Sequence, residues 1–238
     1  MGARASRSEA SHGPPLPPLG LARPRRAGGR SVLAALWART TSRNIAPRGL
    51  SHRELSELLW AAVGVNRRKG RGPFGGVGLT AASASNAQEV VLYAALPQGI
   101  YRYDGAAHRL VPVVRGDHRP LAISPGQRSM LGEAPVELVY VVDVARYDAA
   151  PFQEPGLHDA GTRTSYGNVA VGLVAGNVEL YAASMGLASW FHNCDRRALS
   201  ALLRLRPGQR VLYGHTVGYT ARARQAKVRP RVRRGGAA

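Results

Sequence analysis

The spacing of apolar residues predicts two helices early in the chain. Residues 31–39 have an apolar face made of Val32, Leu33, Leu36 and Trp37. A second helix is expected to begin at Ser51, because Ser51 and Glu54 form a capping box just before an apolar stripe. That stripe consists of Leu55, Leu58, Leu59 and Ala62. Each segment therefore has one face suited to packing against a core.

Between residues 89 and 144 the pattern becomes that of β-strands. Residues 89–96, 99–104 and 108–114 are rich in apolar and aromatic side chains and are separated by short turn sequences, which predicts a meander. Residues 136–144, VELVYVVDV, are almost uniformly apolar. Such a run is typical of a central strand that is buried on both faces.

The last third of the chain mixes helices and strands again. A helical pattern runs from about residue 164 to residue 185 and ends at Gly186. Asp195 is placed to cap a further helix, and residues 209–219 predict a final strand. Because helices and strands do not alternate as regular βαβ units, the pattern predicts an α+β fold.

Composition divides the 238 residues into a domain and two basic ends. The net charge is +19, of which residues 1–30 carry +5 and residues 221–238 carry +7. Residues 1–30 are rich in Pro, Gly and Arg and are expected to be extended or disordered, while residues 31–220 form one domain. The two ends are either solvated Arg-rich segments or binders of polyanions without sequence preference. No recognition helix, zinc finger or ribonucleoprotein motif accompanies this charge.

Cysteine content and hydropathy bear on the compartment. Cys194 is the only cysteine, which excludes an internal disulfide and a cysteine-based metal cluster. No apolar run approaches the roughly 18 residues that a membrane helix needs. Arg25 and Arg26 precede a short apolar stretch, as in a twin-arginine export signal. No small-residue cleavage site follows, which argues against such a signal. We therefore expect a cytoplasmic protein that does not bind membranes.

Four groups of residues are candidates for ligand binding. Residues 39–43, RTTSR, place two arginines on either side of three hydroxyl side chains, a combination that suits a phosphate. Residues 78–90 are mostly small or polar, which lets backbone N–H groups approach a flat ligand closely, and they hold Asn86 and Gln88. The third group is Phe191, His192, Asn193 and Cys194, and the fourth is Arg222 with Arg224. Each group also has a structural alternative. In the same order, these are a solvated helix end, a turn, a buried cysteine and a disordered tail.

Read together, seven stretches identify a family. In chain order they are ARTTSRNI, LSELLWAAVGVNR, TAASASNAQEV, LYAALPQGIYRYDGAAHRLVPV, APVELVYVVD, NVELYAASMGLASW and LYGHTVGY. Over residues 31–220 they resemble the nitroreductase family, and specifically its single-domain bacterial branch related to azoline-oxidising dehydrogenases. The resemblance implies a three-layer α/β/α sandwich of the α+β class. It also implies an intertwined homodimer with FMN bound at the subunit interface.

The resemblance assigns roles to the four groups. It implies that Arg39 and Thr41 bind the FMN phosphate and ribityl chain, that Arg43 lies near the pyrimidine edge, and that Ser83 and Asn86 line the flavin. The partner subunit is expected to place four residues against the isoalloxazine: Phe191, His192, Asn193 and Cys194. Arg222 or Arg224 is expected to approach the phosphate. No residue is expected to act as a catalytic acid or base, and none to bind a metal.

The implied activity is transfer of hydride from NAD(P)H through bound FMN to a nitroaromatic, a quinone or a similar electrophile. An azoline dehydrogenase acting on modified peptides is an alternative, but the Lys–Tyr pair expected there has only Lys69 available within residues 31–220. Further alternatives are a non-catalytic flavin-fold protein with polyanion-binding tails and an enzyme that fragments FMN. Leu79, Ala82 and Thr220 stand where many relatives have Arg, Pro and Pro, differences that are expected to weaken FMN binding or change the acceptor.

Overall fold

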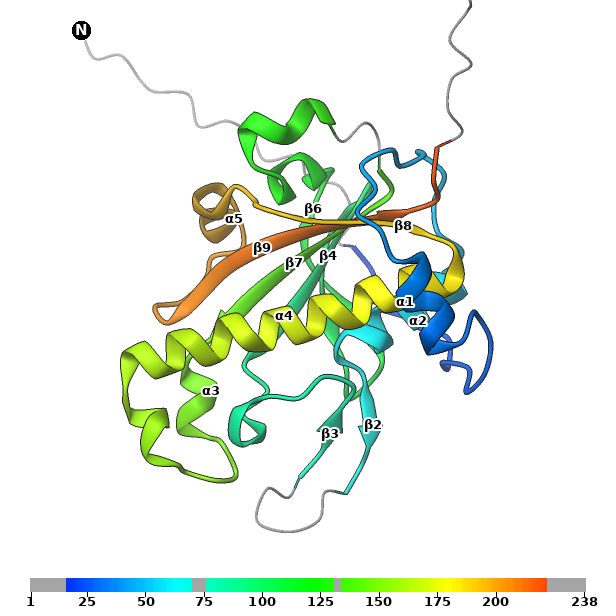
Figure 1. Cartoon of the computed structure of the whole chain (residues 1–238). Coiled ribbons are helices and arrows are strands. Elements are labelled where there is room, and N and C mark those ends of the chain that lie inside the picture. The colour runs from blue at the N-terminus through cyan, green and yellow to red at the C-terminus, as the bar shows by residue number, and fades with distance from the viewer. Residues whose placement is uncertain (1–15, 70–75, 131–133, 222–238) are drawn as a thin grey trace, which may run out of the picture.

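A seven-stranded sheet with helices on both faces forms the centre of the computed structural model, which describes residues 16–69, 76–130 and 134–221 (Figure 1). The strand order is β1-β6-β5-β4-β7-β9-β8, and every neighbouring pair is antiparallel. The strands are β1 (Leu19–Gly20), β4 (Val90–Leu96), β5 (Gly99–Asp104), β6 (Arg109–Arg115), β7 (Val136–Asp143), β8 (Ala188–His192) and β9 (Gln209–Gly218). A separate two-stranded sheet pairs β2 (Val65–Arg67) with β3 (Gly78–Leu79).

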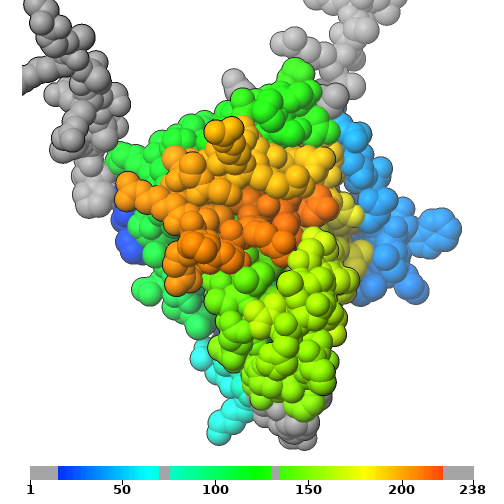
Figure 2. Space-filling view, turned by 90° about the vertical axis from the view of Figure 1, so that its left-hand side faces the viewer, coloured from blue at the N-terminus to red at the C-terminus, as the bar shows by residue number. Residues whose placement is uncertain are grey.

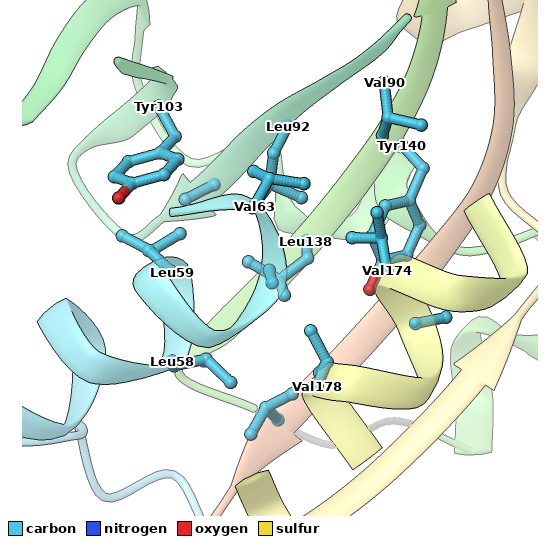
Figure 3. Packing of buried hydrophobic residues seen from close by; sticks show 14 of the residues in the cluster. Leu58, Leu59, Val63, Val90, Leu92, Tyr103, Leu138, Tyr140, Val174 and Val178 are labelled. Carbon is cyan, nitrogen blue, oxygen red and sulfur yellow. The ribbon is translucent and has the colours of Figure 1, made fainter. Parts of the chain in front are cut away.

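The predicted meander and central strand are both confirmed. Strands β4, β5 and β6 follow one another in the sheet, and β7 lies between β4 and β9 with all eight of its residues buried. Because successive side chains of a strand point to opposite faces, β7 contributes to two cores. Leu138 and Tyr140 pack with α2 and α4, as Figure 3 shows, whereas Val139 and Val141 pack towards α5.

The helices begin and end where local sequence signals place them. They are α1 (Val32–Ala38), α2 (His52–Val63), α3 (Ala145–Asp148), α4 (Ala160–Met185) and α5 (Arg196–Leu202). The Ser51–Glu54 capping box is present, Asp195 caps α5, and Gly186 ends α4 in the left-handed conformation at φ 71°. Helix α4 starts earlier than the predicted residue 164, because the Asp159 side chain accepts a hydrogen bond from the Thr162 backbone N–H.

Short 3₁₀ helices complete the described chain: η1 (Ala84–Asn86), η2 (Arg119–Ala122), η3 (Pro125–Met130) and η4 (Pro155–His158). Helices α2 and α4 cover one face of the large sheet, while α5 and η2 lie on the other, which gives the three layers of an α+β sandwich (Figure 1). No helix among the described residues is both long and apolar enough to cross a membrane.

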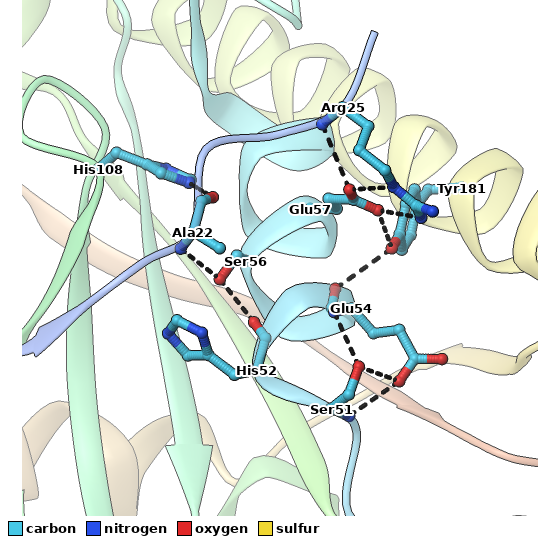
Figure 4. A network of polar contacts seen from close by, with 9 residues as sticks. All are labelled: Ala22, Arg25, Ser51, His52, Glu54, Ser56, Glu57, His108 and Tyr181. Carbon is cyan, nitrogen blue, oxygen red and sulfur yellow. Dashed lines mark hydrogen bonds and ion pairs between the residues drawn. The ribbon is translucent and has the colours of Figure 1, made fainter. Parts of the chain in front are cut away.

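Residues 16–30, which the composition assigns to a tail, are held against the domain. Strand β1 pairs with β6, the Ala22 backbone N–H donates to Ser56 Oγ at 2.9 Å, and Arg25 forms an ion pair with Glu57 at 2.7 Å (Figure 4). Composition alone does not reveal these contacts, because their partners lie more than 30 residues away. Residues 1–15 and 222–238 lie outside the described residues.

Candidate functional site

The arginine-rich segment after α1 lies beside β8 in the same chain. Helix α1 ends with Arg39 as its C-cap, and the extended backbone that follows forms a parallel bridge between Thr41 and Ser189. The Ser42 backbone N–H donates to the Ser189 carbonyl at 2.9 Å, which fixes the segment against the strand. We call Arg39, Thr41 and Arg43 the clamp.

The two guanidinium groups of the clamp have different partners. Arg39 forms an ion pair with Glu179 of α4 at 3.3 Å, whereas Arg43 lies 5.1 Å above the centre of the Trp190 ring. All three clamp residues are exposed. Because an aromatic ring does not neutralise a cation as a carboxylate does, Arg43 presents its full charge to a ligand on a side chain held in place by Trp190.

Strand β8 was not predicted, although it carries Phe191 and His192. The run ASWFH is only five residues long, and its aromatic side chains suggest ligand contact as readily as a strand. Alternation along β8 sends Phe191 to one face, where its ring lies 4.8 Å from Tyr213 and 6.0 Å from Tyr140, measured between centroids. His192 and Trp190 point to the other face, with ring centroids 4.5 Å apart.

His192 is part of a buried polar cluster that joins three strands. Its Nε2 lies 2.8 Å from Thr216 Oγ1, which in turn donates to Glu137 Oε2 at 2.8 Å. His192 Nδ1 lies 3.0 Å from the carbonyl oxygen of Asn193. Because a carbonyl oxygen only accepts, His192 Nδ1 donates to Asn193, and the Thr216 hydroxyl links His192 Nε2 to the Glu137 side chain. His192 Nε2 lies 3.6 Å from Glu137 Oε2.

Glu137 is fully buried, and its second oxygen has no hydrogen-bond partner among the described residues. Burial raises the pKa of its carboxyl group, while hydrogen bonding and attraction to His192 act in the opposite direction. Glu137 therefore depends on His192 and Thr216 for the polar contacts that offset its burial.

A second buried network lies on the opposite face of β8. Ser189 Oγ is 2.6 Å from His215 Nε2, and His215 Nδ1 is 2.8 Å from the Tyr140 hydroxyl. Burial lowers the pKa of His215 to about 3, so the ring is neutral and offers one donor and one acceptor. The network supports β8 at the residue that bridges to Thr41, and the sequence analysis did not identify it.

The small-residue loop forms a separate site. Segment 78–90 contains a single turn of 3₁₀ helix, and Ser85 and Asn86 within this turn, as well as Gln88 after it, have positive φ angles. Ser83 Oγ accepts from the Gln88 backbone N–H at 3.0 Å, and Asn86 Nδ2 donates to the Val77 carbonyl at 3.2 Å. The loop lines a cavity of about 340 Å³ that Arg67 also borders.

Within one chain the clamp and this loop are not brought together. Of the described cavities, none is lined by residues of both. In Figure 1 the β2–β3 pair extends below α4, whereas β8 lies above it.

Cys194 and Asn193 do not form part of either group. Cys194 is buried among Val91, Leu199 and other apolar side chains, and burial raises the pKa of its thiol to about 11. A thiol protonated at neutral pH is a poor nucleophile. Asn193 is exposed and accepts from Arg196 Nη2 at 3.0 Å through its side-chain oxygen. Arg222 and Arg224 lie outside the described residues.

Comparison with known proteins identifies the family. The model of the nitroreductase family matches residues 36–219. The chain belongs to the nitroreductase family. It is therefore an oxidoreductase by family, and the resemblance seen in its motifs is confirmed. No curated protein matches the chain.

Solved structures of nitroreductase-like proteins agree with this assignment. A candidate nitroreductase from Ralstonia eutropha JMP134 is 32% identical, with a TM-score of 0.74, and the match covers 86% of this chain and 90% of that one. The NADPH:FMN oxidoreductase of Vibrio harveyi, solved with NAD⁺, is 20% identical with a TM-score of 0.55 over 83% of this chain and 72% of that one. A chain of the Escherichia coli microcin synthetase McbBCD is 17% identical with a TM-score of 0.60, covering 85% and 78%. The last two show a shared fold.

One buried acid of this nitroreductase-family chain lies beside the small-residue loop. Glu89 is completely buried, and neither of its carboxylate oxygens makes a hydrogen bond of standard geometry among the described residues. Burial raises the pKa of Glu89, and interactions with its own backbone, with Tyr147 and with Arg146 offset this only in part. The folded state therefore favours the protonated acid.

Glu89→Gln is expected to stabilise the protein at neutral pH by about 1–2 kcal/mol, because glutamine is neutral in both states and avoids the cost of protonating the carboxylate, or burying its charge, on folding. A raised carboxyl pKa gives stability that is complete below the ordinary value of 4.5 and is lost as pH rises through the folded-state pKa. The gain should therefore disappear in acid, as measured by urea unfolding across pH. Glu57→Gln is the matched control: Arg25 lowers the pKa of Glu57, so this variant should lose stability at neutral pH. A gain from Glu89→Gln that persists below pH 4.5 would contradict the assignment.

Proposed function

We propose that this chain binds FMN and transfers reducing equivalents from NAD(P)H to a small electrophilic acceptor such as a nitroaromatic or a quinone. Family membership supports the proposal, and the arrangement of the clamp is the main observation behind it. Bound FMN would supply a two-electron carrier between the two substrates. The lone, buried thiol of Cys194 suits a reducing compartment, and we propose the cytoplasm.

The donor set of the two groups suits a phosphorylated flavin. Arg39 and Thr41 offer a cation and a hydroxyl for a phosphate, which favours charge-assisted bonds. Arg43, held above Trp190, offers a fixed positive charge for the electron-rich edge of a ring. Ser83 and Asn86 border a cavity whose described lining contains no acidic residue. These five residues are the ones we propose hold FMN.

The same chain leaves an apolar surface that a second copy would cover. On α1 the Trp37 side chain is 93% exposed, and Figure 2 shows the blue segment around this helix projecting from one edge of the molecule. Other large apolar side chains exposed on α1 and α4 are Val32, Leu33, Leu36, Val169 and Leu173. Clustered exposed apolar residues mark an interaction surface. We propose a homodimer in which the loop of one copy meets the clamp of the other.

The test is the flavin content and reactivity of the purified protein. We expect a yellow protein with near-stoichiometric FMN, whose flavin absorbance NAD(P)H bleaches under anaerobic conditions. Adding nitroaromatics, quinones or azoline peptides in turn should then restore the absorbance at rates that identify the acceptor class. A colourless protein that FMN cannot reconstitute would overturn the proposal.

A further inference from the structure

The largest described cavity belongs to neither the clamp nor the loop. It has a volume of about 790 Å³ and lies between the N-terminal segment, the end of α2, β2 and the β5–β6 turn. Its polar and aromatic lining consists of Arg23, Arg25, Arg26, Trp60, Asn66, Arg68 and His108. We call this cavity the basic groove. We propose that it is a binding site for a nucleotide that carries at least two phosphates.

The wall of the groove is fixed by hydrogen bonds on both sides. His108 Nε2 lies 2.9 Å from the Ala22 carbonyl, and His108 Nδ1 lies 2.8 Å from the Tyr103 hydroxyl. On the other side, the Ala22 backbone N–H reaches Ser56 Oγ of α2, and Arg25 is bound to Glu57 through two nitrogens (Figure 4). The arginines on either side of Arg25 therefore project from a backbone that is already ordered, which lowers the entropic cost of binding.

Charge is left uncompensated in the groove. Among the described residues, the side chains of Arg23, Arg26 and Arg68 have neither an ion pair nor a hydrogen bond. The described lining of the cavity contains no acidic residue, and the nearby Glu57 forms its ion pair with Arg25. Six arginines elsewhere in the described chain, and Arg25 in the groove, form ion pairs with carboxylates. Three unpaired guanidinium groups around one concave surface are the arrangement that binds a polyphosphate.

The rest of the lining favours a nucleotide over a simple anion. Trp60 is partly exposed, and its indole N–H is already used by the Val65 carbonyl at 3.2 Å, so the ring itself is what it offers a ligand. An aromatic face stacks on a base, and Asn66 supplies both a donor and an acceptor. The volume lies within the range of small-molecule sites, about 300–1,000 Å³. A groove of this size suits one nucleotide better than a duplex.

The experiment is titration of the full-length protein, saturated with FMN, with ADP and separately with inorganic pyrophosphate. We expect ADP to bind more tightly than pyrophosphate. The triple variant Arg23→Ala/Arg26→Ala/Arg68→Ala should weaken ADP binding at least about 30-fold, since three charge-assisted contacts are lost. The matched control is Arg197→Ala on α5, an exposed arginine outside the groove, which should leave ADP affinity unchanged.

Each other outcome counts against the proposal. Equal ADP affinity in the triple variant would show that the nucleotide binds elsewhere. If pyrophosphate binds as tightly as ADP, then stacking of the base on Trp60 contributes nothing to the affinity. Binding of a single-stranded oligonucleotide in the absence of ADP binding would identify a nucleic-acid surface instead. Flavin content is measured in all variants and is expected to stay constant, so that failure of the groove is distinguished from failure of the FMN site.

Discussion

His192→Leu is expected to lower the free energy of unfolding by about 3–5 kcal/mol. The substitution removes the ring whose Nε2 lies 3.6 Å from Glu137 Oε2, and it leaves a fully buried carboxyl group whose one remaining hydrogen-bond partner among the described residues is Thr216. Breaking one half of a buried pair is costly because the other charge remains out of water. Urea denaturation at neutral pH measures the loss.

Two further measurements separate this cause from a packing defect. Burial raises the pKa of Glu137, and a carboxyl group with a raised pKa destabilises the fold only as pH rises through that value. The deficit of the variant should therefore shrink in acid. Replacing the whole cluster, His192→Leu with Glu137→Met and Thr216→Val, should recover most of the stability, since apolar groups of similar volume often substitute for a buried pair. A loss in the single variant that is independent of pH would contradict the ionic interpretation.

Arg43→Ala is expected to weaken FMN binding about 10- to 100-fold, the effect of losing one charge-assisted contact. The fold should hardly change, because Arg43 is exposed and its contact with Trp190 is worth about 0.5–1 kcal/mol at such a site. Flavin retained after gel filtration, and the dissociation constant from fluorescence titration, measure the effect.

Arg48→Ala is the matched control for this prediction. Arg48 is an exposed arginine of the same connecting segment, and its guanidinium lies 4.1 Å above the Tyr219 ring, so it reproduces the cation–π contact outside the clamp. It should leave FMN binding unchanged. Deleting residues 222–238 should matter less than Arg43→Ala. If the deletion or the control has the larger effect, the assignment of the clamp is wrong.

Local signals were sufficient for most of the fold. The Ser51–Glu54 box, Asp195 and Gly186 each act within a few residues, and the structure shows all of them in the predicted roles. Strand β8 was missed because its pairing with β9 stabilises it. A run of five residues does not by itself indicate a pairing with a strand that is distant in the sequence. Residues 16–30 were misjudged for the same reason, since Ser56, Glu57 and His108 anchor them from far along the chain.

The candidate site was predicted less completely. The residue types of the clamp and the loop point to a phosphate and a flat ligand, but sequence does not show that Asn86 also binds the carbonyl of Val77. Nor does it show that Glu137, His192 and Thr216, from three different strands, share one buried cluster. Strand register determines these contacts, and a shift of one residue would send each side chain to the opposite face.

The bridge between Thr41 and Ser189 has a consequence beyond ligand binding. Strand β8 is the last strand of the sheet, and an uncovered terminal strand is a template for aggregation. Residues 41 and 42 occupy its outer side and use the Ser189 carbonyl that would otherwise accept a bond from a foreign chain. The segment that presents the arginines thus also shields the sheet from unwanted polymerisation.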